Sequence, residues 1–315
     1  MKPAMEAVGS ISRRKEKFLF RQILDRRELL GPLMLAPAIV YIFLLIGFPF
    51  FLALYYSFSN VTTGSSSLTF VGLENFRGIL QSATFRRALR NTFVFTFASQ
   101  ILVMILAKIL ALALNKQFRG KSIVRFLILL PWVSPISLGT IGWKWMYDSL
   151  YSVINWTLQA VGIFGPGTWP MWLGEPTLAM TAVVLVHVWR TLPFATVIIL
   201  AGLTAIPQEI LDAASVDGAG LWRRTFQVVL PLLIPILCVA VLFGVVFTFT
   251  DMTVIYVLTR GGPYDTTQVL GSYAFQMGIL GGDLGEGAAI SLFLFPLLAI
   301  VAILMLRIAR RAEVE

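Results

Sequence analysis

The chain has 315 residues, of which 57% are hydrophobic and 13% are charged, and its formal net charge is +9. Soluble domains carry about 25% charged residues, so this composition excludes an ordinary soluble protein and indicates burial in lipid. The positive charges cluster beside apolar segments, which indicates membrane orientation and not nucleic-acid binding.

The chain has one cysteine, Cys238, and one histidine, His187. A single cysteine excludes an intrachain disulfide framework, and a single histidine excludes a His-rich metal site. Both residues lie in apolar runs, so we expect each to have a packing role and expect no metal site.

Residues 1–28 form a polar, basic segment that we expect to be cytoplasmic. The apolar run that follows Arg27 is too long for the core of a signal peptide and is typical of a retained anchor. Residues 29–315 are therefore predicted to form one transmembrane domain.

Six apolar segments follow, each near or above the ~20 residues that span ~30 Å of hydrocarbon. Most of them contain proline, which kinks a membrane helix where neighbours satisfy the freed carbonyls. The predicted fold is an all-α polytopic membrane protein with six transmembrane helices. The expected spans are Leu33–Phe58, Thr92–Leu114, Phe126–Tyr147, Leu178–Leu203, Val228–Leu258 and Ala288–Ile308.

Most lysines and arginines lie in the connections that share a side with the N-terminus, which predicts that both termini are cytoplasmic. Four arginines before the second span oppose this assignment. We interpret Ile79–Arg90 as an amphipathic helix at the outer surface. The loop with Trp156, Trp169 and Trp172 carries no lysine or arginine, as expected of an outer interfacial belt.

The polar stretch that begins at Pro207 lies on the predicted cytoplasmic side. Proline can start a helix, and the residues from Glu209 to Ala214 propagate it. Asp217-Gly218 is a strong stop signal. A second helix is predicted after Gly220, with Trp222, Phe226, Val229 and Leu230 on one face and Arg223, Arg224 and Gln227 on the other.

This stretch resembles the cytoplasmic EAA loop of ATP-binding-cassette (ABC) importer permeases. The matching residues are Asp212-Ala213-Ala214, Asp217-Gly218-Ala219, Phe226 and Leu230-Pro231, with Asp212 where that family usually has Glu. The segments at Phe70–Phe76, Leu130–Trp132, Leu258–Pro263 and Gly285–Ser291 also resemble sugar-type permeases. The likeness covers about residues 35–310 and is nearest to the maltose-system large-permease and glycerol-phosphate-permease type.

The resemblance implies a type I importer permease fold with a core at about 88–308 and a coupling loop at about 207–226. It implies as partners a second homologous permease, two ABC ATPase subunits that hold ATP and Mg, and an extracytoplasmic solute-binding protein. By resemblance, the residues that couple to the ATPase are Glu209, Asp212, Ala213, Ala214, Asp217, Gly218 and Ala219.

No catalytic site is expected in this chain. Gly120-Lys121-Ser122 mimics the end of a phosphate loop, but Asn115 stands where the earlier glycine should be, and no strand is predicted before it. Energy for transport must therefore come from a partner, so we predict a transport subunit and not an enzyme.

Polar residues inside the membrane are costly and are functional candidates by default. Asp251 lies in the fifth apolar run, where a continuing helix would present hydroxyls and a carboxylate to a cavity. The predicted substrate-pathway residues are Thr248, Thr250, Asp251, Tyr256 and Ser291, partly by resemblance. Asp251 could instead cap or pair with a helix. Lys108, Lys144 and Arg190 are expected to reach toward the interface.

The predicted function is transport of a sugar or sugar derivative across the cytoplasmic membrane, driven by a separate ATPase. A permease of the same type for glycerol phosphate or another polyol is an alternative. An ion-driven secondary transporter would need two related halves and paired intramembrane acids, of which only Asp251 qualifies. A scaffold or channel subunit is a third class and predicts no ATPase partner.

Overall fold

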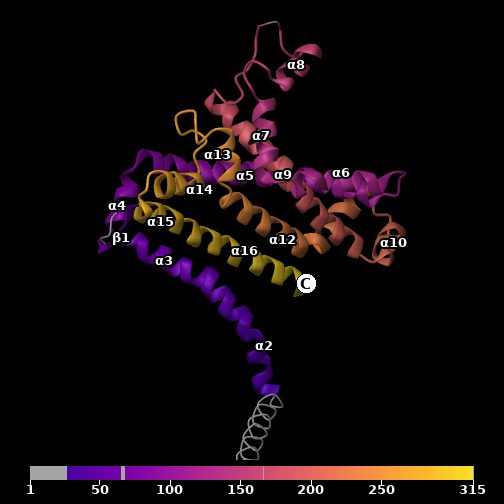
Figure 1. The fold of residues 1–315 in the computed structure, drawn as a ribbon. Helices are drawn as coiled ribbons and strands as arrows, with labels where there is room; N and C mark the ends of the chain where they lie inside the picture. The colour runs from indigo at the N-terminus through magenta and orange to yellow at the C-terminus, as the bar shows by residue number, and fades with distance from the viewer. Residues whose placement is uncertain (1–26, 65–67, 166, 315) are drawn as a thin grey trace, which may run out of the picture. The chain divides into compact units, whose positions relative to one another are not determined.

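The computed structural model describes residues 27–64, 68–165 and 167–314, and these residues are predominantly helical (Figure 1). The expected basic N-terminal segment lies almost wholly outside the described residues. Among those residues, five helices are long and apolar enough to cross a membrane, or up to six if one bent pair counts as a single span. The expectation of an all-α polytopic protein is thus confirmed.

The chain divides into two compact units, residues 1–55 and 56–315. The first unit contains α2 (Arg27–Ile42), the π-helical turn η1 (Phe43–Gly47) and all but the last two residues of α3 (Phe48–Ser57). These three elements follow one another without a break. Together they supply the apolar helix Gly31–Ser57, which corresponds to the expected first span.

The second unit begins with a short hairpin in which β1 (Ser59–Asn60) pairs antiparallel with β2 (Thr69–Phe70). The Asn75 side-chain amide donates to the carbonyls of Ser57 and Ser59 at 3.0 Å each, and so joins the hairpin to the next helix. The remaining elements are α4 (Glu74–Gln81), α5 (Ala83–Asn115), α6 (Lys121–Val133), α7 (Ile136–Met146), α8 (Val153–Ala160), α9 (Pro176–Ala205), α10 (Gln208–Val216), α11 (Leu221–Arg223), η2 (Arg224–Val229), α12 (Leu230–Phe249), α13 (Thr253–Leu258), α14 (Leu270–Phe275), η3 (Gln276–Leu280), α15 (Leu284–Leu292) and α16 (Leu294–Val314).

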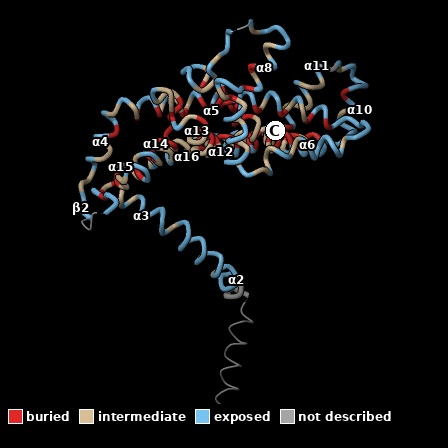
Figure 2. The backbone as a smooth tube through the Cα atoms, turned by 45° about the horizontal axis from the view of Figure 1, so that its top comes forward, coloured by how far each residue is buried: buried red, intermediate tan, exposed pale blue. Residues whose placement is uncertain are grey.

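The core of the second unit lies where α5, α9 and α12 pack together, and the buried positions concentrate there (Figure 2). Small and β-branched side chains allow the close approach: Ala107 and Ala111 come from α5, while Val183 and Ile199 come from α9. A second cluster, around Ile79 and other fully buried side chains, joins α4 and the start of α5 to α14 and α15. Helix α16 packs against α12.

The expected third span is interrupted. Its two halves, α6 and α7, meet at an angle of 95° across Ser134 and Pro135. Pro135 has no N–H to continue the helical ladder, and its backbone is extended, at ψ 123°. The prediction of one kinked helix over Phe126–Tyr147 was therefore wrong.

The helix found at the expected fifth span is shorter than predicted, and it begins earlier in the chain. Helix α12 ends at Phe249, and three residues separate it from α13, so Val228–Leu258 is not one helix. The predicted amphipathic helix Ile79–Arg90 is also broken, because Ser82 ends α4 and caps α5. The Ser82 hydroxyl accepts from the Phe85 N–H at 3.3 Å.

Gly287 and Gly278 lie back to back where α15 crosses η3. A Cβ added at Gly287 would overlap the Cα of Gly278, which is backbone and cannot move aside cheaply. We expect Gly287→Ala to lower the unfolding free energy by about 1–3 kcal/mol, the usual cost of overpacking. Thermal unfolding of the purified protein measures this change.

The matched control is Gly142→Ala in α7, where an added Cβ meets nothing within 4 Å. Alanine favours helix by about 0.5–1 kcal/mol over glycine, so this control should leave the melting temperature unchanged or raise it. Equal melting temperatures for Gly287→Ala and the unmodified protein would contradict the packing argument.

Candidate functional site

The loop that carries the acid-alanine motif is a helix that ends in a glycine cap. Helix α10 follows Pro207, whose extended backbone places it just outside the helix. At the other end Gly218 has a φ of +73°, which glycine adopts without steric cost. The Gly218 N–H donates to the Ser215 carbonyl at 3.1 Å, and the Ala219 N–H donates to the Ala214 carbonyl at 2.9 Å. These two bonds form a Schellman cap, which makes the turn a defined structure.

Most of the predicted coupling residues face outward. Glu209, Asp212, Ala213, Asp217 and Gly218 are exposed. Ala214 is buried and Ala219 is half-buried, so these two anchor the loop. The loop therefore presents carboxylates beside small side chains on its exposed surface.

The segment after the turn differs from the prediction of a separate short helix. Helix α11 runs without a break through η2 into α12, because the residues at both junctions keep right-handed helical angles. Trp222 stacks on Phe226 with ring centroids 5.7 Å apart, and the Lys108 ammonium lies 5.2 Å from the centre of the Phe226 ring. Movement of the loop would therefore be transmitted directly to α12.

A buried polar network lies within the membrane-spanning bundle. The Asp251 carboxylate lies 2.8 Å from His187 Nδ1 and 3.4 Å from the Arg190 guanidinium. His187 Nε2 lies 2.9 Å from the Thr248 hydroxyl, and the Gln100 amide donates to the same hydroxyl at 3.2 Å. The network thus joins α5, α9, α12 and the break that follows α12.

Asp251 also shapes the backbone. Its second carboxylate oxygen accepts from the N–H groups of Thr253 at 2.9 Å and Val254 at 3.2 Å, where α13 begins. A buried carboxylate must be paired and hydrogen-bonded to be tolerated, and here four donors surround it. The capping and pairing role that the sequence left open for Asp251 is therefore confirmed.

The outcome for His187 and Arg190 differs from expectation. His187 is fully buried but has a partner on each ring nitrogen, so a plain packing role was wrong. The Arg190 side chain is 25% exposed and points toward Asp251, so it does not simply reach for the interface. Cys238 is buried, as its packing role requires.

The structure brings only two of the predicted substrate-pathway residues together, Thr248 and Asp251. Thr250 is exposed, and its hydroxyl donates to the Val246 carbonyl at 2.8 Å. Tyr256 packs edge-on against Phe275 at 5.3 Å. Ser291 is exposed and donates to the Gly287 carbonyl at 3.0 Å.

An aromatic wall lies beside the exposed end of the network. Trp132 stacks on Phe194 with ring centroids 4.8 Å apart, and Phe247 packs 5.4 Å from both. The Arg190 guanidinium lies 6.0 Å from the Trp132 ring. The sequence contained one signal for this site: His187 and Arg190 are costly ionisable residues three positions apart on one apolar helix.

Comparison with known proteins gives consistent results. Residues 103–314 match the family model "binding-protein-dependent transport system inner membrane component". The chain is 35% identical over 285 residues to the trehalose/maltose transport system permease protein MalF of Thermococcus litoralis, covering 90% of this chain and 95% of that protein.

Two further similarities extend this result. The chain is 33% identical over 287 residues to the sulfoquinovosyl glycerol transport system permease protein SmoG of Agrobacterium fabrum, covering 91% of this chain and 92% of that protein. Its fold is similar to a chain of a bacterial ABC transporter involved in the import of alginate. That match has a TM-score of 0.78 and 21% identity, and covers 93% of this chain and 98% of that one.

Proposed function

Because this chain belongs to the binding-protein-dependent transport system inner membrane component family, we propose that it is the sugar-conducting permease subunit of an ABC importer. It is a multi-pass inner membrane protein and a transport subunit. The cargo is a sugar or sugar derivative. The permeases named for trehalose/maltose and for sulfoquinovosyl glycerol support this class of cargo, since both match over nine-tenths of the chain or more.

The energy comes from a separate ATPase, and this chain holds no nucleotide itself. Gly120-Lys121-Ser122 follows α5, a helix, whereas a phosphate loop follows a strand. The assembly we propose contains a second, homologous permease, two ATPase subunits that bind ATP and Mg, and an extracytoplasmic solute-binding protein.

The observation that carries the coupling proposal is the outward-facing, glycine-capped loop of α10. Its exposed carboxylates set the position of the loop on the ATPase surface. Its small side chains allow the two surfaces to pack closely. When ATP closes the ATPase dimer, the loop moves and carries η2 and α12 with it. The ligand-bound ATPase favours one of two conformations, so the equilibrium of the bundle shifts.

The substrate pathway we propose runs beside the aromatic wall at the exposed end of the polar network. Sugar rings offer apolar faces to aromatic side chains and hydroxyls to charged or polar groups. Trp132, Phe194 and Phe247 supply the first kind of contact, and Arg190 supplies the second. Thr250, Tyr256 and Ser291 remain predicted pathway residues.

Uptake by the complete complex in liposomes tests the function. We expect uptake of a radiolabelled disaccharide, delivered by the solute-binding protein, to require ATP inside the liposomes and to persist when an ionophore collapses ion gradients. Uptake without ATP that the ionophore abolishes would establish a secondary transporter instead. The sugar itself is chosen by screening the co-encoded solute-binding protein for thermal shifts against a panel of sugars.

A further inference from the structure

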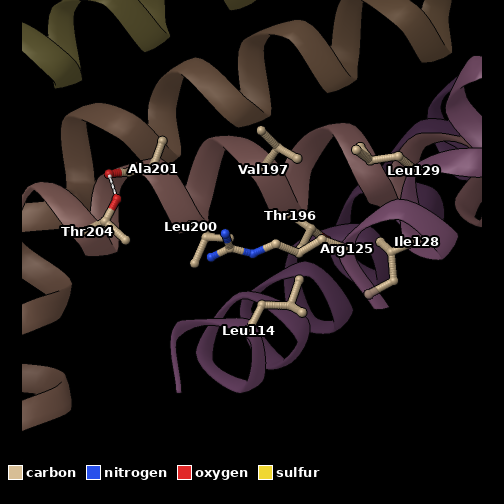
Figure 3. Close-up of a pocket in the computed structure, with 9 residues that line it drawn as sticks. All are labelled: Leu114, Arg125, Ile128, Leu129, Thr196, Val197, Leu200, Ala201 and Thr204. Atoms are coloured by element: carbon tan, nitrogen blue, oxygen red, sulfur yellow. Dashed lines mark hydrogen bonds between the residues drawn. The ribbon is translucent and has the colours of Figure 1, made fainter. Parts of the chain in front are cut away.

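A groove of about 350 Å³ lies between α5, α6 and α9 (Figure 3). Its walls are almost entirely apolar, apart from one guanidinium and two threonine hydroxyls. The lining residues are Leu114, Arg125, Ile128, Leu129, Thr196, Val197, Leu200, Ala201 and Thr204. This groove is separate from the polar network around Asp251 and from the loop of α10.

Arg125 is the only charged residue in the lining, and it has no counter-ion there. The ion pairs found in the described part of the chain all involve Asp251, so none involves Arg125. The Thr196 hydroxyl donates to the Leu192 carbonyl at 2.7 Å, and the Thr204 hydroxyl donates to the Ala201 carbonyl at 2.9 Å. Both hydroxyl protons are thus in use, which leaves the guanidinium as the available donor.

The groove opens at one end of the bundle. Leu114 and Thr204 each lie one residue before the ends of their helices, at Asn115 and Ala205. The connection from α5 to α6 lies at this end and carries Lys116 and Arg119, and Lys121 begins α6, so three more cations lie near the groove. The distribution of lysine and arginine places this end at the cytoplasmic surface, and hence at the headgroups of the inner leaflet.

We propose that this groove binds one anionic phospholipid of the inner leaflet. Its phosphate is held by the Arg125 guanidinium, which pairs with phosphate through two parallel hydrogen bonds. One acyl chain lies along Ile128, Val197 and Leu200. Charge complementarity favours this occupant, because basic pockets between membrane helices on the cytoplasmic side suit anionic headgroups. An apolar helix from another subunit would leave the Arg125 charge without a partner.

Lipid retention by the complete complex tests the proposal. The complex is incubated with mixed micelles of dioleoylphosphatidylglycerol and dioleoylphosphatidylcholine, washed, and extracted for quantification by mass spectrometry. We expect phosphatidylglycerol to be retained in preference to phosphatidylcholine. Arg125→Gln should lower the retained phosphatidylglycerol about tenfold, as expected for loss of a charge-assisted hydrogen bond.

Two variants distinguish lipid binding in the groove from general electrostatic attraction of anionic lipid to the basic α5–α6 connection. Ala201→Phe narrows the groove and keeps every charge, so it should also lower retention. Lys116→Gln removes a neighbouring charge that does not line the groove, so retention should stay close to that of the unmodified complex. An equal loss in Lys116→Gln and Arg125→Gln would overturn the site.

Two other occupants give distinct results. If excess inorganic phosphate releases the bound lipid, the groove is a simple anion site, and the acyl-chain contact is wrong. If the unmodified complex retains no phosphatidylglycerol and Ala201→Phe lowers the amount of second permease that co-purifies, the groove is a subunit interface. Either result overturns the lipid proposal while leaving the ATP-driven uptake assay unaffected.

Discussion

Gly218→Val is expected to abolish sugar uptake and sugar-stimulated ATP hydrolysis while the bundle stays folded. Gly218 has a φ of +73°, where a β-branched side chain costs roughly 1–2 kcal/mol or more. An added Cβ meets nothing within 4 Å inside the chain, so the substitution creates no internal clash. The substitution therefore perturbs the Schellman cap and the exposed surface of the α10 loop, which we propose contacts the ATPase.

The matched control for this prediction is Gly120→Val. Gly120 has a φ of +83° and open space around its Cα, and it lies in the α5–α6 connection at the same end of the bundle. The two variants carry similar backbone strain, so only a specific role of the α10 loop separates them. Reconstituted uptake and ATPase rates provide the measurement. Normal uptake in Gly218→Val, or equal loss in Gly120→Val, would remove the coupling role.

Asp251→Leu is expected to destabilise the protein by about 3–5 kcal/mol, the cost of breaking a buried ion pair by removing one partner. The change leaves His187 Nδ1 and the Arg190 guanidinium without their acceptor, and the Thr253 and Val254 N–H groups without a cap. The melting temperature of the complex and the amount inserted in the membrane should both fall.

Two companion variants show which contacts matter. Asp251→Asn keeps an oxygen for the Thr253 and Val254 N–H groups, so it should lose less stability than leucine. Adding Arg190→Gln to Asp251→Asn removes the unpaired charge and should restore part of the loss, which a double-mutant cycle measures. Strictly additive losses for the two changes would show that Arg190 and Asp251 do not interact.

The local features of this fold were predictable because they depend on short stretches of chain. A long apolar run must form a helix in lipid, which satisfies its own backbone, and the spans at 178–203 and 288–308 were located in this way. The helix before Gly218 and the glycine that ends it were also predictable from the sequence, because a helix cap involves neighbouring residues only. The composition alone indicated a membrane protein, and the positions of most of its lysines and arginines indicated which side the connections face.

The breaks within spans could not be located so readily. Pro135 and Pro193 both lie within long apolar segments, yet the chain turns by 95° beside Pro135 while α9 continues through Pro193. Whether a proline kinks or ends a membrane helix depends on neighbours that satisfy the freed carbonyl, and those neighbours come from other helices.

The sequence by itself determined the membrane class, most of the spans and the acid-alanine loop, because hydrophobic length, charge placement and turn chemistry are local properties. Only the tertiary structure decided the polar network. His187 and Asp251 are 64 positions apart, and their pairing exists because α9 packs against α12 and α12 stops at Phe249. It also decided that Arg125 faces an apolar groove, since three helices must converge to form the walls.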